Sequence, residues 1–475
     1  MRSRNSPEGA EPAESAEKAT AELAEIAEKH LSANSAISAV AFRWLLRKEC
    51  RELIASRAWW VLLMATGPLV GVTFISAVRT YAEASGLNGN AVGVGEAFSP
   101  LVGIWGPTFG AYELAAVFFL PFVAIRAVSG DRLSGALKLE LQHPMPMATR
   151  VAAKVIVLVG GWLVTYAAAL LAILLWRSYG GSVYVPELLV VTLGHTLNAV
   201  LTISLAVAVA AMAEHPSSAA IVTLAITIGT WIIDIEAAVH GGWWERLAAY
   251  TPAAMVANFQ HALLLANVTV ISTVLSATGI AIAGVWLALG TPVRRRVVRS
   301  AAIAVTAAIV TAGAAVLPFH WDASETRLNS LPEPAEGALK ALPAPLTIEA
   351  HLAAEDPRRL ELERVALAKL RRALPSVKVI YTSRTTSGLY EQSDPGYGEI
   401  WYDLGGKRVM SRVITEEGVL ETIFGLAGRA PADEAEAPFA GHPLVSRPAG
   451  AALIFYGIWP VMVAGAFWLI SRRQI

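Results

Sequence analysis

Eight long apolar segments dominate this sequence, and each is close to the length that a membrane helix needs. A helix that crosses about 30 Å of hydrocarbon needs roughly 20 apolar residues. Only 16% of the 475 residues are charged and 55% are hydrophobic, whereas soluble domains carry roughly 25% charged residues. The sequence therefore predicts a polytopic α-helical membrane protein. The segments lie at residues 58–79, 109–129, 152–176, 188–212, 218–235, 268–290, 300–318 and 449–470.

The distribution of basic residues predicts how the chain is threaded. Residues 247–266 form a further apolar segment, but Pro252 and several polar residues interrupt it. If it were a ninth span, the arginine cluster at 294–299 and the final Arg472 and Arg473 would lie outside, against the positive-inside rule. We therefore expect eight spans, a re-entrant or interfacial segment at 247–266, and both chain ends in the cytoplasm. The location expected is a bacterial inner membrane.

With this threading, residues 319–447 form an extracytoplasmic domain, because long domains translocate largely regardless of charge. Strands are predicted at 346–352 and 377–383, with helices at 357–374 and 416–428. Between them, Gly405-Gly406 joins two alternating segments, which is typical of a β-hairpin. This order favours a small thioredoxin-like α/β domain. The single cysteine, Cys50, excludes a CxxC redox pair within it. At the other end of the chain, residues 1–35 are expected to be a partly disordered cytoplasmic extension.

An amphipathic helix is predicted at 36–57, just before the first span. Its apolar side carries Phe42, Leu45, Leu46 and Leu53, and its polar side carries several basic residues, including Lys48, followed by Glu49. This pattern is typical of a helix that lies in the membrane interface.

A second amphipathic segment follows the second span. Leu133, Leu137 and Leu141 recur every four residues, beside Arg132 and Lys138. Such a helix suits docking in a partner's groove, although an ordinary loop between spans remains an equal alternative.

Together with the first six spans, these two segments resemble the permease subunits of ABC-2-type ABC exporters. In that family an elbow helix carries a Lys-Glu pair, as Lys48 and Glu49 do here. The loop after the second span has an acidic-Arg pair, Gly, Leu, Pro and then a Lys that opens the third span. The matching residues are Asp131, Arg132, Gly135, Leu137, Pro144 and Lys154, with Asp131 in place of the more usual Glu. Residues 250–264 resemble the re-entrant outer hairpin that precedes the sixth span.

This resemblance covers about residues 36–292 and implies a six-helix permease domain at 58–292. It implies a homodimer or pseudo-dimer in membrane lipid, with a separate cytoplasmic P-loop ATPase that binds the ATP. The ATPase would dock on Asp131, Arg132, Leu133, Leu137, Lys138 and Leu141.

The segment after the seventh span, 300–318, resembles the start of the outer domain of gliding-motility-associated ABC transporter auxiliary subunits. Their D-x-T-x-x-x-x-S-L pattern is matched loosely by Asp322, Ser324, Leu328, Ser330 and Leu331. The domain here is shorter than theirs, and the helix at 449–470 follows it. The resemblance implies a permease fused to a truncated auxiliary domain, with a periplasmic partner left open.

Enzyme signatures are absent from the sequence. It contains no GxxxxGK[ST], HExxH or GxSxG motif, so we expect no catalytic site, cofactor or metal in this chain. The balanced charge gives no reason to expect nucleic acid.

Polar residues inside the spans are few. Glu113, Arg126, Asp234 and Glu236 are expected near span ends, where a charge costs little. His195 and Asn198, one turn apart in the fourth span, are expected to face the bundle interior. There they would form an interhelical hydrogen bond or contact a substrate.

The function expected is the membrane permease of an ABC transporter that exports a substrate or transmits force to the outer domain. Two alternatives stay open: a membrane anchor or signalling protein that presents the outer domain, and an ion-coupled secondary transporter. The secondary transporter is disfavoured by the apparent lack of a central carboxylate.

Overall fold

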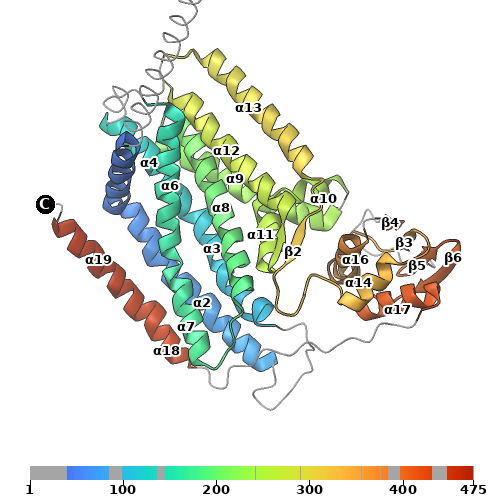
Figure 1. Ribbon diagram of the computed structural model, residues 1–475. Coiled ribbons are helices and arrows are strands. Elements are labelled where there is room, and N and C mark those ends of the chain that lie inside the picture. Colours follow the sequence, from blue (N-terminus) through green and yellow to red (C-terminus); the bar gives the residue numbers. More distant parts are fainter. Residues whose placement is uncertain are drawn as a thin grey trace, which may run out of the picture.

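The computed structural model describes residues 40–84, 99–135, 145–240, 242–288, 290–354, 356–374, 376–382, 396–429 and 447–473. Within these residues, eight helices are long and apolar enough to cross a membrane. They coincide with the eight segments expected from the sequence, so a polytopic membrane protein is confirmed. The rest of the described chain adds an α/β domain at one end of the bundle (Figure 1).

Seven of the eight membrane helices are longer than the apolar segments that predicted them, because further residues at one or both ends continue the helix. Three of the eight are divided into pieces. The bounds are α2 (Arg57–Ala84), η1 (Leu101–Trp105) with α3 (Gly106–Phe118) and α4 (Leu120–Ser134), α6 (Met147–Thr165) with α7 (Ala167–Ser178), α8 (Val185–Met212), α9 (Pro216–His240), α12 (Ala266–Leu287), α13 (Val293–Ala314), and α18 (Pro448–Ala452) with η3 (Leu453–Ile458) and α19 (Trp459–Arg473).

The second membrane helix breaks in its middle. Phe119 has φ −115° between α3 and α4, and Pro121 opens α4. Pro lacks the N–H that would continue the helical ladder, so the ladder is interrupted next to Pro121. However, the whole helix runs from Leu101 to Ser134. Glu113 therefore lies in the interior of this helix, and its expected place near the membrane boundary stays a prediction.

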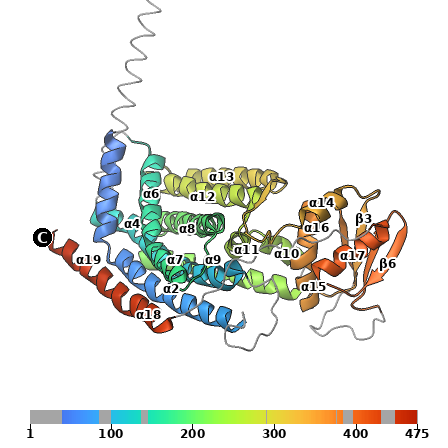
Figure 2. The same ribbon diagram turned by 60° about the horizontal axis from the view of Figure 1, so that its bottom comes forward.

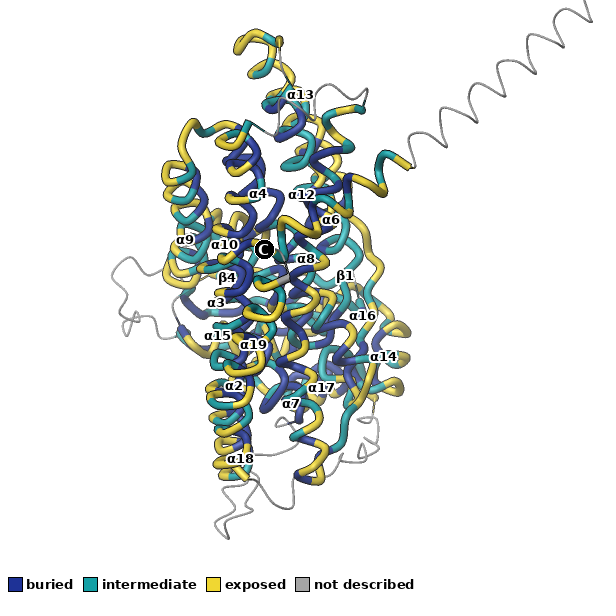
Figure 3. Tube along the Cα trace, turned by 90° about the vertical axis from the view of Figure 1, so that its left-hand side faces the viewer, coloured by how far each residue is buried: buried dark blue, intermediate teal, exposed yellow. Residues whose placement is uncertain are grey.

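The fifth membrane helix also differs from its expected length. α9 has 25 residues, about 37 Å at 1.5 Å per residue, and continues through Asp234 and Glu236 to His240. One contact that holds this end is made by Thr251, whose hydroxyl donates to Asp234 Oδ1 at 2.6 Å. Only four of the 25 residues of α9 are buried, and exposed residues, drawn in yellow, lie along the helix (Figure 3).

The segment after α9 contains two short helices, α10 (Trp243–Ala248) and α11 (Pro252–Gln260), and a short strand, β1 (Leu263–Leu265). Nine residues in α11 reach only about 14 Å, so this helix is too short to span a membrane. It packs on α8, where Phe259 lies against Gly194; a Cβ at Gly194 would lie 2.2 Å from the Phe259 Cβ. The segment enters the side of the bundle and leads directly into α12.

The two helices that flank the α/β domain lie on opposite sides of the bundle. α13 packs beside α12, while α18, η3 and α19 pack along α2 (Figures 1 and 2). The second contact uses two glycines one helical turn apart, Gly67 and Gly71. A Cβ would lie 2.1 Å from the Trp459 ring at Gly67 and 2.5 Å from Phe455 at Gly71. Small residues thus let the two helices approach closely, and Trp459 Nε1 donates to the carbonyl of Leu63 at 2.9 Å.

The α/β domain has a four-stranded sheet with the order β4-β3-β5-β6. β3 and β4 are parallel, and the other two pairs are antiparallel. The expected hairpin is confirmed: Gly405 and Gly406 have φ 60° and 86°, values typical of a type I′ turn. The bounds are β3 (Leu346–Ala350), β4 (Lys378–Tyr381), β5 (Ile400–Leu404) and β6 (Lys407–Ser411), with α14 (Glu333–Lys340), α15 (Pro357–Leu362), η2 (Glu363–Leu367), α16 (Ala368–Ala373) and α17 (Glu416–Ala427).

Alternation along β3 and β5 builds this domain's core. Leu346, Ile348 and Ala350 point to one face and are fully buried, as are the matching residues of β5, because successive side chains of a strand point to opposite faces. They pack with apolar residues of α14, η2, α16 and α17. This core is separate from the core of the membrane bundle, so the chain has two independent hydrophobic centres.

Candidate functional site

The predicted elbow helix is present and covers residues 40–55 in the described chain. Leu45 and Glu49 are buried, while Phe42, Leu46, Lys48 and Leu53 are half-buried. Leu53 and its neighbour Ile54 pack against the bundle core. Cys50, in the same helix, is exposed. The helix thus lies against the bundle along the side that carries Leu45, Glu49 and Leu53.

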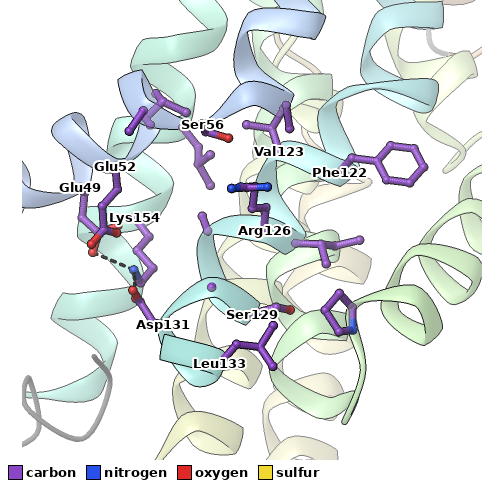
Figure 4. Close-up of a pocket in the computed structure, with 18 of the residues that line it drawn as sticks. Glu49, Glu52, Ser56, Phe122, Val123, Arg126, Ser129, Asp131, Leu133 and Lys154 are labelled. Carbon is purple, nitrogen blue, oxygen red and sulfur yellow. Dashed lines mark hydrogen bonds and ion pairs between the residues drawn. The ribbon is translucent and has the colours of Figure 1, made fainter. Parts of the chain in front are cut away.

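Glu49 is buried because it meets two charged residues from the membrane helices. Lys154 Nζ, near the start of α6, lies 2.7 Å from Glu49 Oε1 and also donates to Asp131 Oδ2, near the end of α4. Lys48 Nζ lies 3.3 Å from Glu49 Oε1 and 3.4 Å from Asp131 Oδ1, and 3.1 Å from Glu52 Oε1. The five residues form what we call the charge cluster, which joins three elements. Figure 4 labels Glu49, Glu52, Asp131 and Lys154 of this cluster.

The electrostatics of the charge cluster are dominated by burial. Side chains of Glu49, Asp131 and Lys154 are at most 6% exposed. Burial raises the pKa of Glu49 above its ordinary value, although Lys154 and Lys48 act in the opposite direction. Buried ions are costly to leave without a partner. The elbow helix, the end of α4 and the start of α6 are therefore held together as one unit.

Arg132 ties the same end of α4 to a fourth element. Its guanidinium donates to the carbonyl oxygens of Ala210, Ala211 and Ala213 at 3.1, 2.6 and 2.9 Å. These are carbonyls at the C-terminal end of α8, which have no partner within their own helix, and a cation there also complements the helix dipole. Asp131 and Arg132, predicted to dock a partner, thus both bind within this chain.

The predicted docking helix at 131–142 does not run unbroken. α4 ends at Ser134, and Gly135 adopts a left-handed conformation with φ 74°, which ends a helix. Leu133 lies in the last turn of α4 with a 77% exposed side chain. Leu137, Lys138 and Leu141 lie outside the described residues, so their docking role stays a prediction.

A cleft of about 710 Å³ opens beside the charge cluster, between the elbow helix, α4, α6 and α9. Glu49, Glu52, Asp131 and Lys154 line one side of it. Arg126 of α4 points into it from another side (Figure 4). The remaining wall is largely apolar.

His195 and Asn198 are both buried in α8. The His195 ring packs 5.6 Å from Phe109 and 6.3 Å from Tyr112. Among the described residues, neither of its ring nitrogens has a hydrogen-bond partner, so the structure lacks the expected interhelical hydrogen bond of this residue. Asn198 instead faces α11, in a narrow gap lined by Met255 and Phe259.

A second polar contact joins α11 to the bundle. Gln260 Nε2 donates to Glu113 Oε1 at 2.5 Å. Sequence reasoning missed this pair, because the two residues lie 147 positions apart in the chain and no local pattern connects them.

The connection between the bundle and the α/β domain is built on Asp322, in the short strand β2 (His320–Asp322), which pairs with β1. Its carboxylate accepts from the Ser324 backbone N–H, the Asn329 backbone N–H and the Ser330 hydroxyl at 3.1, 2.9 and 2.8 Å. Burial acts to raise the pKa of Asp322, but hydrogen bonds from the side chains of Ser324, Asn329 and Ser330 and from the Ser324 backbone outweigh burial and lower that pKa. We call residues 320–331 the joint.

The joint links the two hydrophobic cores. Leu328 packs on the membrane bundle, and Leu331 lies in the core of the α/β domain. Glu187, in the first turn of α8, accepts from the Glu325 backbone N–H at 2.7 Å. The pattern quoted from the sequence thus identified a compact turn, with Asp322, Ser324 and Ser330 in direct contact.

Most of the cluster residues were noted in the sequence, but not that they meet. Lys154 was expected to open the third span, and Glu49 to belong to the elbow pair. Their contact joins residues 105 positions apart, and no local pattern carries that information. No family model, no curated protein and no solved structure matches this chain.

Proposed function

We propose that this chain is the transmembrane permease subunit of an ABC-type exporter in a bacterial inner membrane. A separate cytoplasmic P-loop ATPase would drive it, and two copies or a pseudo-dimer would form the transport unit. The observation that carries the proposal is the buried Lys154, which holds Glu49 of the elbow helix and Asp131 of α4 together. These are the segments that the resemblance assigns to the ATPase interface.

The charge cluster gives this interface a mechanical role. A push on the end of α4 moves the elbow helix and α6 with it, since breaking the cluster would leave buried charges without partners. Arg132 passes the same movement to the end of α8. Nucleotide-driven closure of the ATPases would thus rearrange several membrane helices at once.

The α/β domain would lie on the outer side and handle substrate or force there. Its sheet order, with one parallel pair beside an antiparallel hairpin, supports the thioredoxin-like arrangement expected from the sequence. With Cys50 as the chain's one cysteine, a CxxC redox role does not accompany it. The joint would transmit movements of α8 and β1 to this domain.

Affinity purification from native membranes tests the proposal. We expect a P-loop ATPase to co-purify with the full chain, and Leu133→Asp to reduce its recovery, because Leu133 is an exposed apolar side chain at the end of α4. The control is Leu360→Asp, because Leu360 is an exposed leucine in the α/β domain, outside the membrane helices. Recovery of no ATPase at all would favour an anchor that presents the α/β domain.

An ion-coupled secondary transporter is a second candidate, and one observation favours it. Glu113 lies inside the second membrane helix and contacts Gln260 at the end of the short helix α11. Carboxylates beside discontinuous helices are used for ion coupling. Transport that survives removal of ATP but is lost in Glu113→Gln would select this candidate over the permease.

A further inference from the structure

The cleft beside the charge cluster has features that the permease proposal does not use. It encloses about 710 Å³ between the elbow helix, α4, α6 and α9. Phe122, Leu133 and Ala220 give it an apolar side, and its opposite side carries the carboxylates of the charge cluster. A site with both an apolar wall and fixed charges suits an amphiphilic ligand rather than a small ion.

Arg126 is the first of these features. It lies in the second membrane helix and points into the cleft (Figure 4). Among the described residues its guanidinium forms no hydrogen bond or ion pair. A charged side chain in a membrane helix is costly, and such residues pair with a counter-ion or mark a binding site. An arginine here is a ready donor for a phosphate group.

Ser56 supplies a second, independent feature. This residue interrupts the helical chain between the elbow helix and α2, and its side chain is buried and lines the cleft. Its hydroxyl has no hydrogen-bond partner within the described part of the chain. Buried hydroxyls normally have a partner, so the Ser56 hydroxyl points to a ligand in the cleft.

The charge cluster supplies the negatively charged side of the cleft. Its three carboxylates, Glu49, Glu52 and Asp131, have ligand atoms within 4.8 Å of one another, and two ammonium groups, Lys48 and Lys154, face them. With three carboxylates and two ammonium groups, the charge cluster therefore carries one more negative charge than positive charges. Glu52, with a 43% exposed side chain, is the carboxylate best placed to accept a further N–H donor.

We propose that this cleft binds a membrane phospholipid whose headgroup carries both a phosphate and a primary ammonium, as phosphatidylethanolamine does. Arg126 and Ser56 donate to the phosphate, and Glu52 accepts from the ammonium. The acyl chains lie against the side that contains Phe122. This site does not depend on the proposed transport function, and a failure of either leaves the other standing.

The test uses the full chain reconstituted in bilayer discs of defined phospholipids, with the lipids retained after detergent exchange measured by mass spectrometry. We expect wild-type protein to retain phosphatidylethanolamine in preference to phosphatidylglycerol. Arg126→Gln is expected to lower retention of both by about tenfold, because one charge-assisted interaction is lost. Arg177→Gln, at an exposed arginine in the last turn of α7, is the matched control and should retain lipid normally.

Glu52→Gln separately tests the contact with the headgroup ammonium. We expect it to remove the preference for phosphatidylethanolamine while leaving total phospholipid retention unchanged. Glu83→Gln is its control, since Glu83 is also exposed and also forms an ion pair with a residue one turn away, Arg79.

Equal retention in Arg126→Gln and Arg177→Gln would overturn the site. Displacement of bound lipid by inorganic phosphate at millimolar concentration would overturn the phospholipid assignment, since it would reveal a site for small anions.

Discussion

Lys154 Nζ lies 2.7 Å from Glu49 Oε1, and the two residues belong to elements that are 105 positions apart in the chain. This contact closes the elbow helix onto the third membrane helix. The same ammonium also bonds to Asp131, so one lysine holds two carboxylates from different elements. Lys154 therefore connects the elbow helix, α4 and α6, and its loss affects all three elements.

Replacing Lys154 by methionine should strongly destabilise the membrane bundle. The change keeps an unbranched side chain of similar length but leaves Glu49 and Asp131 buried without their shared partner, at a cost of about 3–5 kcal/mol. Thermal unfolding of the detergent-solubilised chain measures the loss. Lys340→Met is the control, because Lys340 forms an exposed ion pair with Glu336, a kind worth about 0–1 kcal/mol.

The neutral triple variant sharpens this prediction. Adding Glu49→Gln and Asp131→Asn to Lys154→Met should recover most of the lost stability, since a buried ion network can be replaced by neutral groups at little cost. If Lys154→Met proved as stable as Lys340→Met, the cluster would have no structural role.

Gly71→Ala should weaken the packing of the last membrane helix on α2. The added Cβ would lie 2.5 Å from Phe455 Cβ, so one helix must shift, at about 1–3 kcal/mol. Gly110→Ala is the control, because a Cβ there meets no atom within 4 Å. Thermal unfolding measures both. Equal stability of the two alanine variants would contradict the close contact.

Asp322→Asn should loosen the joint. Asparagine keeps the shape but loses the charge that accepts from Ser324, Asn329 and Ser330, and hydrogen bonds to a charged group are worth about 1.5–3 kcal/mol each. Trypsin cleavage at Arg327 should become faster, while Asp403→Asn, at the hairpin turn, should leave that rate unchanged. A cleavage rate equal to wild type would show that the carboxylate does not hold the joint.

The same residue predicts a pH dependence. The pKa of Asp322 is lowered in the folded joint, so the unfolded joint binds the proton more tightly. The contribution of Asp322 to stability is therefore complete above its ordinary pKa of about 3.9 and is lost as the pH falls through the lower folded value. Amide exchange at Ser324 and Asn329 should accelerate in that acid range, and Asp322→Asn should abolish the change.

The α/β domain should unfold independently of the membrane helices, because its core is separate. Leu367→Ala removes a fully buried side chain and should cost about 2–5 kcal/mol. Leu360→Ala, at a 66% exposed position, should have little effect. Protease sensitivity confined to 332–429 measures the change; simultaneous digestion of the membrane helices would argue for a single cooperative unit.

Much of the architecture could be predicted from local patterns. Apolar length predicted the eight membrane helices, and strand alternation with Gly405-Gly406 predicted the elements of the α/β domain. These features depend on neighbouring residues, which the sequence displays directly. Helix ends were less predictable: α9 continues past Asp234 because Thr251 accommodates that carboxylate, and such a partner cannot be recognised in a hydropathy pattern.

The candidate site could be predicted only in its parts. Lys48, Glu49, Asp131 and Lys154 were each noted, but their meeting depends on the rotation and depth at which the elbow helix packs. Arg132 suggested a surface contact, whereas its guanidinium binds the end of α8. Gly135 gave the only local signal that the docking helix would be interrupted, since glycine readily adopts the left-handed conformation.

The glycine face of α2 also has a consequence for the order in which this protein is made. Trp459 binds the carbonyl of Leu63, 396 positions earlier in the chain. A ribosome adds about 5–20 residues per second, so α2 would spend tens of seconds in the membrane before its partner helix is synthesised. During that interval Gly67 and Gly71 are exposed to other helices, and a chain stopped before residue 448 would keep that surface open permanently.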